Sequence, residues 1–310
     1  MDMDGMNSLF YLDDSYKKHL PQQMPDQVTL IYLISGFGDA GEVSDVVSKT
    51  ILGTLEHHFI GEFIMDDLVN YRAKRPRMVF SNNKLRDFQA PALELYLVFD
   101  DAGVPFYLLA GQEPDFRWEQ FCETVIDIVE TLDIDQVNWL HSIPMPVPHT
   151  RPAGMYLHGN YDMDEKAKED KWSPTIIVPS SAAHLLELRL GEAGIKVGGF
   201  AMQVPHYIAE NAYTPAAVSA FEILSSMTSL MFNTDDLRDR SRDMEFQINK
   251  QVEESEEIKR VVEALEENYD KISDDDQFHP IHLLSEETLP TAEEITEELE
   301  RYMENKRSDD

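Results

Sequence analysis

Apolar runs and helical patterns alternate along most of the chain. Residues 28–34 form an unbroken apolar run, which is typical of a strand buried on both faces of a parallel sheet. Further strands are expected at 58–65, 136–143, 155–159, 175–178 and 196–204. Helices are expected at 43–55, 115–132, 181–193 and from Thr214 onward. This alternation predicts an α/β fold, a mostly parallel sheet flanked by helices, over roughly residues 26–232.

One local pattern predicts an antiparallel pair within this sheet. Residues 93–99 and 104–109 are both strand-like, and Asp100-Asp101-Ala102-Gly103 lies between them. Aspartate and glycine are favoured in tight turns. We therefore expect a hairpin here.

The pattern changes after Asn233, where apolar residues recur at helical spacing among many charges. One long or broken helix is expected from Asp235 to Asp270. A second helix should begin at the capping box Thr291-Ala292-Glu293-Glu294. We therefore divide the chain into an α/β domain, residues 1–232, and an acidic helical C-terminal region, residues 233–310.

The net charge of the chain excludes some classes of binding partner. The 310 residues carry a formal net charge of −33, and residues 251–310 hold 21 Asp and Glu against six Lys and Arg. Such a surface repels phosphate backbones and anionic lipid, so we expect neither nucleic acid nor membrane as a partner. No apolar run approaches the roughly 20 residues that span a bilayer. The acidic N-terminus and the single cysteine favour a cytoplasmic location.

The turn after the first strand matches a dinucleotide-binding pattern. Gly36-Phe37-Gly38-Asp39-Ala40-Gly41 has the form G-x-G-x-x-G between a strand and a helix, and Asp66 after the next strand could contact a ribose. Asp39, however, places a negative charge where an anion would bind. The segment is thus a dinucleotide loop, another ligand loop or a tight structural turn, and the last two are favoured.

Four cations then occur within eight residues of an otherwise acidic chain: Arg72, Lys74, Arg75 and Arg77, beside Tyr71. Arginine binds carboxylates and phosphates with two parallel hydrogen bonds. The cluster therefore indicates either a site for an anion or acidic partner, or an internal ion-pair network with Asp66, Asp67 or the acidic helices.

Three further loops place polar residues after expected strands. Two contain Pro-His pairs, at His149 with Arg151 and at His206 with Tyr207, and the third holds Glu113 and Asp115. Ligand sites of open parallel sheets lie beyond the carboxyl ends of the strands. The alternatives are backbone hydrogen bonding by the histidines and helix capping by the carboxylates.

No catalytic constellation is recognisable. The chain has no G-x-S-x-G elbow, no P-loop and no H-E-x-x-H. Cys122 lies on an apolar helix face, and the adjacent His57 and His58 would point to opposite faces of a strand. We expect no catalytic residues, no metal and no cofactor. Whether the protein is an enzyme stays open, with the balance against it.

Taken in order, these motifs resemble the bacterial branch of the proteasome assembly chaperone 2 family. The resemblance rests on residues 36–41, 66–76, 111–115, 148–152 and 204–207 and spans about residues 25–270. It implies a phosphorylase/hydrolase-like α/β domain followed by a small helical region. It also implies non-catalytic, chaperone-like work in assembling other proteins.

Two hypotheses follow. The first is a non-catalytic interaction protein that acts either as a homo-oligomer, for which a trimer is one possibility, or with a protein partner. The second is a small-molecule binder or enzyme for a phosphate, nucleotide or acidic metabolite, which requires the five motifs to converge on one pocket. The candidate residues for either site are Gly36, Asp39, Gly41, Asp66, Tyr71, Arg72, Arg75, Glu113, Asp115, His149, Arg151, His206 and Tyr207.

Overall fold

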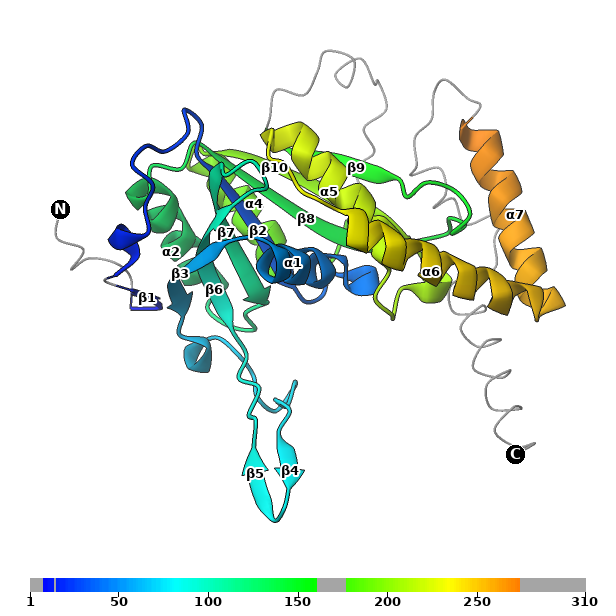
Figure 1. Ribbon diagram of the computed structural model, residues 1–310, viewed down its shortest axis with the longest axis horizontal. Coiled ribbons are helices and arrows are strands. Elements are labelled where there is room, and N and C mark those ends of the chain that lie inside the picture. Colours follow the sequence, from blue (N-terminus) through cyan, green and yellow to red (C-terminus); the bar gives the residue numbers. More distant parts are fainter. Residues whose placement is uncertain (1–7, 14, 161–176, 274–310) are drawn as a thin grey trace.

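A mixed eight-stranded sheet runs through the centre of the computed structural model, which describes residues 8–13, 15–160 and 177–273 (Figure 1). The strands lie in the order β1-β3-β6-β7-β2-β8-β10-β9. Their bounds are Phe10–Leu12 (β1), Thr29–Ser35 (β2), His57–Phe63 (β3), Leu93–Phe99 (β6), Pro105–Gln112 (β7), Gln136–Met145 (β8), Met155–Gly159 (β9) and Lys196–Pro205 (β10).

The centre of this sheet is parallel and its margins are antiparallel. Strand β2 pairs in parallel with β7 and β8, and β8 pairs in parallel with β10. The expected hairpin is confirmed as the antiparallel pair β6 and β7, and its turn is held by Asp100, whose Oδ1 accepts from the amides of Ala102 and Val104. The predicted α/β class, with a mostly parallel sheet between helices, is confirmed.

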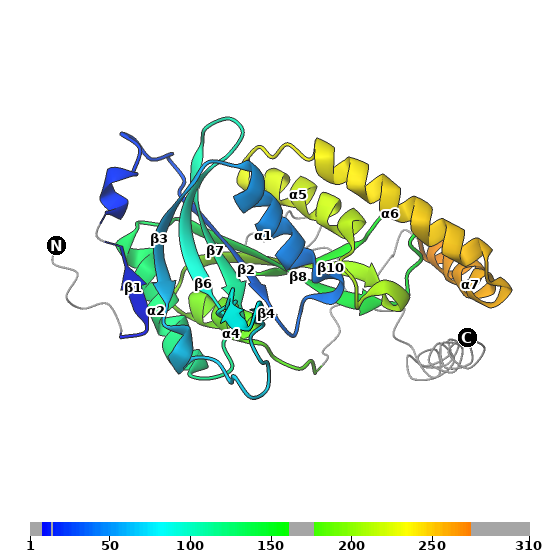
Figure 2. The same ribbon diagram turned by 60° about the horizontal axis from the view of Figure 1, so that its bottom comes forward.

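Helices cover both faces of the sheet, as Figure 2 shows. Helices α1 (Val43–Thr54) and α5 (Thr214–Thr228) pack on one face, and α2 (Trp118–Thr131) and α4 (Ala182–Glu192) pack on the other. Two further helices, α6 (Asp235–Glu253) and α7 (Glu256–Ser273), follow α5 in the chain. Side chains of β2 alternate between the two resulting cores, because successive residues of a strand point to opposite faces. Tyr32 packs in the core under α2 and α4, whereas Leu33 packs in the core under α1 and α5.

The region after residue 233 continues this architecture. Helix α6 packs along α5, and its Leu237 is buried in the same core as α1 and α5. The expected long helix is broken at Glu254 and Ser255 into α6 and α7. The domain boundary after residue 232 stays a prediction, and the expected helix at Thr291 lies outside the described residues. No described helix is long and apolar enough to cross a membrane.

The structure differs from the sequence prediction at two other places. Ile177 and Val178 lie outside any strand, and the rest of the strand expected at 175–178 falls outside the described residues. A short hairpin, β4 (Val79–Ser81) and β5 (Lys84–Arg86), was not expected. It projects away from the central sheet (Figure 1). We call residues 72–88, which contain this hairpin, the arm.

Candidate functional site

The five motifs follow strands that run in one direction, so they line the same edge of the sheet. The loops after β7, β2, β8 and β10 are neighbours because these strands are neighbours, and the 66–76 segment follows β3. This is the edge at which ligands bind in open α/β sheets. The contacts of each motif show what its side chains do there.

Asp39 occupies the N-terminus of α1. Its carboxylate accepts from the amide of Ser44 at 2.7 Å and from that of Asp45 at 3.4 Å. The Ser142 hydroxyl of β8 also lies 3.4 Å from it. Burial raises the pKa of Asp39 to about 6, against the lowering effect of the hydrogen bonds from Ser44. The chain's own carboxylate thus takes the position at a helix N-terminus where a pyrophosphate would bind in a dinucleotide loop.

Gly41 joins this loop to the segment after β10. Its amide donates to Ala209 O at 2.6 Å, and its own carbonyl accepts from the amide of Tyr213 at 2.7 Å. Its φ is +67°, and a Cβ here would lie 2.9 Å from the Cβ of Tyr213 and 3.1 Å from Val204. Only glycine fits, since both the backbone conformation and the contact exclude a side chain.

Glu113 connects three segments. Its Oε2 accepts from the amide of Phe37 at 2.9 Å, and its Oε1 accepts from the amide of Ala182, the first residue of α4, at 2.8 Å. Gly36 allows this approach, because a Cβ on it would lie 2.2 Å from the Glu113 carboxylate. Glu113 therefore positions the glycine loop against the N-terminus of α4.

Asp115 and Asp66 hold the second motif in place. The amide of Asn70 donates to Asp115 Oδ2 at 2.5 Å, and the Tyr71 hydroxyl donates to Asp66. Asp67 pairs with Arg117 at 3.2 Å. Within the described chain, neither Arg72 nor Arg75 forms an ion pair with Asp66 or Asp67. The internal network that was one alternative for these cations is absent from the described residues.

His149 is buried and links the loop after β8 to the end of β10 and to α6. Its backbone amide donates to the Tyr207 hydroxyl at 2.8 Å, its Nδ1 lies 2.7 Å from the same hydroxyl, and its Nε2 lies 3.2 Å from Asn249 Oδ1. Burial lowers the pKa of His149 and raises that of Tyr207. Burial likewise lowers the pKa of His206, whose Nδ1 lies 3.4 Å from Met145 O.

Arg151 fixes α7 to the α/β core. Its guanidinium donates two parallel hydrogen bonds to Asp270, at 2.7 and 2.6 Å, and lies 3.4 Å from Glu266. This paired geometry is among the stronger polar contacts a surface arginine can make. The arginine that suggested an anion site is therefore occupied by the chain's own carboxylates.

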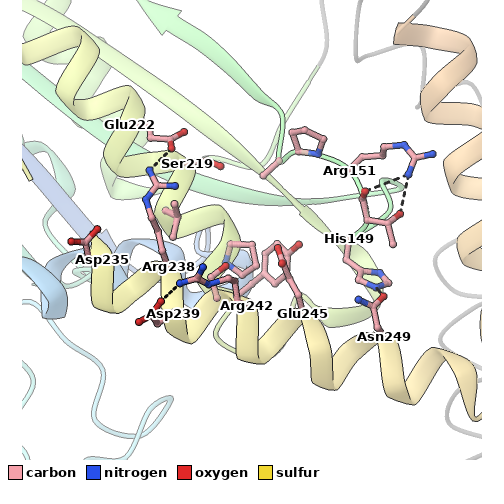
Figure 3. Close-up of a pocket in the computed structure, with 17 residues that line it drawn as sticks. His149, Arg151, Ser219, Glu222, Asp235, Arg238, Asp239, Arg242, Glu245 and Asn249 are labelled. Carbon is pink, nitrogen blue, oxygen red and sulfur yellow. Dashed lines mark hydrogen bonds and ion pairs between the residues drawn. The ribbon is translucent and has the colours of Figure 1, made fainter. Parts of the chain in front are cut away.

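A cavity of about 1010 Å³ lies beside this loop, between α5 and α6 (Figure 3). Its two α6 arginines are already paired: Arg238 with Glu222 at 2.6 Å, and Arg242 with Asp239. The cavity is lined by His149, Thr150, Arg151, Pro152, Ala153, Tyr213, Pro215, Val218, Ser219, Glu222, Asp235, Arg238, Asp239, Ser241, Arg242, Glu245 and Asn249.

The motifs do not converge on this cavity. Of the candidate residues only His149 and Arg151 line it, while Arg75 and Asp115 line a separate cavity of about 290 Å³. Gly36, Asp39, Gly41 and Glu113 line neither. Neither of these two cavities, both formed by described residues, brings the five motifs together.

Sequence reasoning missed a histidine cluster beneath the glycine loop. His141 Nε2 lies 3.1 Å from His158 Nε2, and the His141 and His184 ring centroids are 4.8 Å apart. Burial, with the two neighbouring imidazoles, lowers the pKa of His141 to about 3. His158 Nδ1 lies 2.7 Å from Glu187. The described residues contain no group of His, Cys, Asp and Glu arranged to hold a metal ion.

The arm was also missed, although the sequence carried a signal for it. Asn82 and Asn83 have φ of 50° and 58°, the left-handed conformation of a two-residue hairpin turn that asparagine tolerates. The flanking side chains are apolar yet exposed. They are Met78, Val79, Phe80, Leu85 and Phe88.

These contacts and the layered sheet define a three-layer α/β protein whose strand-end loops bind one another. The model of the PAC2 family matches residues 33–252. The chain belongs to the PAC2 family, as the ordered motifs predicted.

Two solved structures share both sequence and fold with this chain. A protein of unknown function from Mycobacterium tuberculosis is 33% identical, covers 87% of this chain and 91% of its own, and has a TM-score of 0.79. A protein of unknown function from Corynebacterium glutamicum is 32% identical, covers 86% of this chain and 98% of its own, and has the same TM-score of 0.79. No curated protein matches the chain.

A more distant structure shares the fold alone. The proteasome-assembly chaperone homologue of Mycobacterium tuberculosis is 21% identical, covers 76% of this chain and all of its own (100%), and has a TM-score of 0.68.

Proposed function

We propose that the protein is a non-catalytic, chaperone-like interaction module that works in the cytoplasm as a homo-oligomer or with a protein partner. The observation that carries this proposal is the arm. It combines exposed apolar side chains, such as Phe80 and Leu85, with a cluster of cations in an acidic chain. A monomeric soluble protein rarely exposes apolar groups together in this way unless they contact another molecule.

The names of structural relatives support the same class of function. One is a proteasome-assembly chaperone homologue, and another, with 12% identity and a TM-score of 0.55, is an archaeal proteasome activator from Pyrococcus furiosus. Both names describe work on a protein assembly. We extend that class of function, though not the proteasome itself, to this chain.

The small-molecule hypothesis has weaker support. Of its three candidate arginines, Arg151 is paired with Asp270 inside the chain, whereas Arg72 and Arg75 have no ion pair among the described residues. Only four of its candidate residues line the two described cavities, two in each. A thermal-shift screen with nucleotides and sugar phosphates tests it, and a reproducible rise in unfolding temperature with any of these ligands would revive it.

A comparative pull-down tests the proposed function. The arm variant carries Phe80→Ser and Leu85→Ser, and the matched control is Phe246→Ser on α6, because Phe246 is 68% exposed and Phe80 is 69% exposed. The proposal predicts a stoichiometric protein recovered by the wild type and the control and lost with the arm variant. Recovery of the same protein by the arm variant contradicts the proposal, as does a wild type that neither recovers another protein nor associates with itself.

A further inference from the structure

Two buried hydroxyl groups line the cavity of about 1010 Å³ between α5 and α6, which we call the α5–α6 cavity. Tyr213, just before α5, is 3% exposed, and Ser241 of α6 is 7% exposed. Among the described residues, neither hydroxyl has a hydrogen-bond partner. A buried hydroxyl without a partner costs free energy, so a molecule that enters the cavity and bonds to both groups would recover that cost.

A carboxylate without an ion pair lies beside these hydroxyls. Glu245, labelled in Figure 3, is half-buried on α6 four residues after Ser241, so the two side chains are neighbours on one face of the helix. Burial, followed by the neighbouring Tyr207 and Glu245, raises the pKa of Tyr213, which places its protonated hydroxyl near the Glu245 carboxylate. In the part of the chain that the structure describes, Glu245 forms no hydrogen bond or ion pair.

The other charges of the cavity are already offset. Its three arginines are paired with carboxylates of the chain, as Arg238 is with Glu222 at 2.6 Å. Asp235 lies in the first turn of α6, where the helix dipole stabilises a carboxylate. Glu245 lies near the middle of the same helix, where the dipole has no such effect. Within the described lining, Glu245 is thus the carboxylate whose charge neither an arginine nor a helix end offsets.

An alkylammonium group matches these side chains. Such a group carries one positive charge and three N–H donors, and Glu245, Tyr213 and Ser241 offer a negative charge and three acceptors. Hydrogen bonds of this kind are stronger than those between neutral groups. The nearby apolar lining, which includes Pro215 and Val218, suits the methylene chain that carries an ammonium group. A phosphate or a carboxylate would instead meet the charge of Glu245.

We propose that the α5–α6 cavity binds a primary alkylammonium group, which donates to Glu245, Tyr213 and Ser241. Two kinds of molecule carry this group on a flexible chain: a peptide, in its lysine side chain, and a free polyamine. The volume of about 1010 Å³ has room for either, and the net charge of −33 attracts both. The inference goes beyond the proposed function and does not depend on the arm.

Isothermal titration calorimetry on the full chain tests this site with two probes. One is spermidine, and the other is a pentapeptide with blocked ends and one central lysine. The same peptide with norleucine in place of lysine controls for the charge. The variants are Glu245→Gln and Tyr213→Phe, and the matched control is Asp243→Asn, because Asp243 is an exposed carboxylate of α6 outside the cavity lining. Circular dichroism checks that each variant is folded.

We expect one binding site for at least one of the two amines and none for the norleucine peptide. Glu245→Gln should weaken binding about 30-fold and Tyr213→Phe about 5-fold, whereas Asp243→Asn should bind like the wild type. Binding of the peptide alone assigns the site to a partner's lysine, binding of spermidine alone assigns it to a free polyamine, and binding of both shows recognition of the ammonium group itself. No binding of either amine, an unchanged affinity in Glu245→Gln, or equal losses in Glu245→Gln and Asp243→Asn overturns the inference.

Thermal unfolding of the free protein gives a second test. Because the Tyr213 hydroxyl has no partner in the described chain, Tyr213→Phe should unfold at the same temperature as the wild type or above it when no probe is present. A lower unfolding temperature would mean that the hydroxyl is bonded inside the chain, and it would overturn the inference. Neither experiment involves the arm, so this inference and the proposed function can fail separately.

Discussion

The strand-end loops and the arm use similar residues in opposite ways. In the loops, polar groups are paired inside the chain: Asp39 caps α1, Glu113 binds two backbone amides, and Arg151 binds Asp270. In the arm, Arg75 and Phe80 are exposed and have no described ion pair or core contact. Asp39, Glu113 and Arg151 therefore stabilise the fold, whereas the cations of the arm, Arg72 and Arg75 of the second motif among them, form no ion pair in the described chain.

Because the loop side chains bond to other parts of the chain, substitutions in the loops should lower the free energy of unfolding more than substitutions in the arm. The largest effect is expected for Gly41→Ala, because the substitution adds a left-handed backbone penalty to an overlap with Tyr213 and Val204. We expect a loss of about 2–4 kcal/mol in the free energy of unfolding, measured with urea.

Gly103→Ala is the matched control for this change. Gly103 also has a positive φ, +79°, but nothing lies within 4 Å of a Cβ there. Gly103→Ala should lower the free energy of unfolding by the backbone penalty alone, about 1–2 kcal/mol. Equal losses in the two variants would show that the packing between Gly41 and Tyr213 contributes little.

The second effect concerns pH and Asp39. Its pKa is raised to about 6 in the folded state, so the unfolded chain loses this proton at lower pH than the folded chain. The free energy of unfolding of the wild type should therefore fall, relative to that of Asp39→Asn, by about 2 kcal/mol as pH rises from 4 to 7. Urea unfolding of both proteins across this range measures the difference. A difference that stays constant with pH contradicts a buried Asp39.

The third effect is smaller. Glu113→Ala leaves the amides of Phe37 and Ala182 without their acceptor, and we expect a loss of about 1–2 kcal/mol. Glu130→Ala, an exposed glutamate on α2, is the control and should stay within about 0.5 kcal/mol. Thermal unfolding, followed by circular dichroism, compares the two variants. A Glu113 variant as stable as its control would show that Glu113 does not stabilise these loops.

The smallest effect on stability is expected in the arm. Phe80→Ser with Leu85→Ser should change the free energy of unfolding of the dilute protein by less than about 0.5 kcal/mol, because both side chains are exposed. Urea unfolding at low protein concentration measures it. A loss above about 1 kcal/mol would mean that the arm packs on its own chain, and the contrast with the loops would disappear.

The sequence predicted the fold well because periodicity reports burial. The apolar run at residues 28–34 became β2, buried on both faces, and the Asp100–Gly103 turn joins β6 to β7. It predicted β4 and β5 poorly, because three-residue strands have too few positions for a pattern. The Asn82-Asn83 pair was the local signal.

The placement of the motifs after strands could be predicted from the sequence, whereas the contacts of their side chains could not. The motifs do line one edge of the sheet, as their places after strands indicated. Their partners come from distant segments, such as Asn249 for His149 and Ala182 for Glu113, and sequence spacing does not give such pairs. The cluster of His141, His158 and His184 was missed for the same reason.

Amide hydrogen exchange at increasing protein concentration distinguishes the arm from the strand-end loops, because it follows both regions in one experiment. We expect that amides of residues 78–88 exchange rapidly in dilute protein and become protected as concentration rises, or when a partner is added. The loop at residues 36–41 should keep the same protection throughout. An arm that exchanges rapidly under every condition, while the strand-end loops become protected instead, would contradict the account.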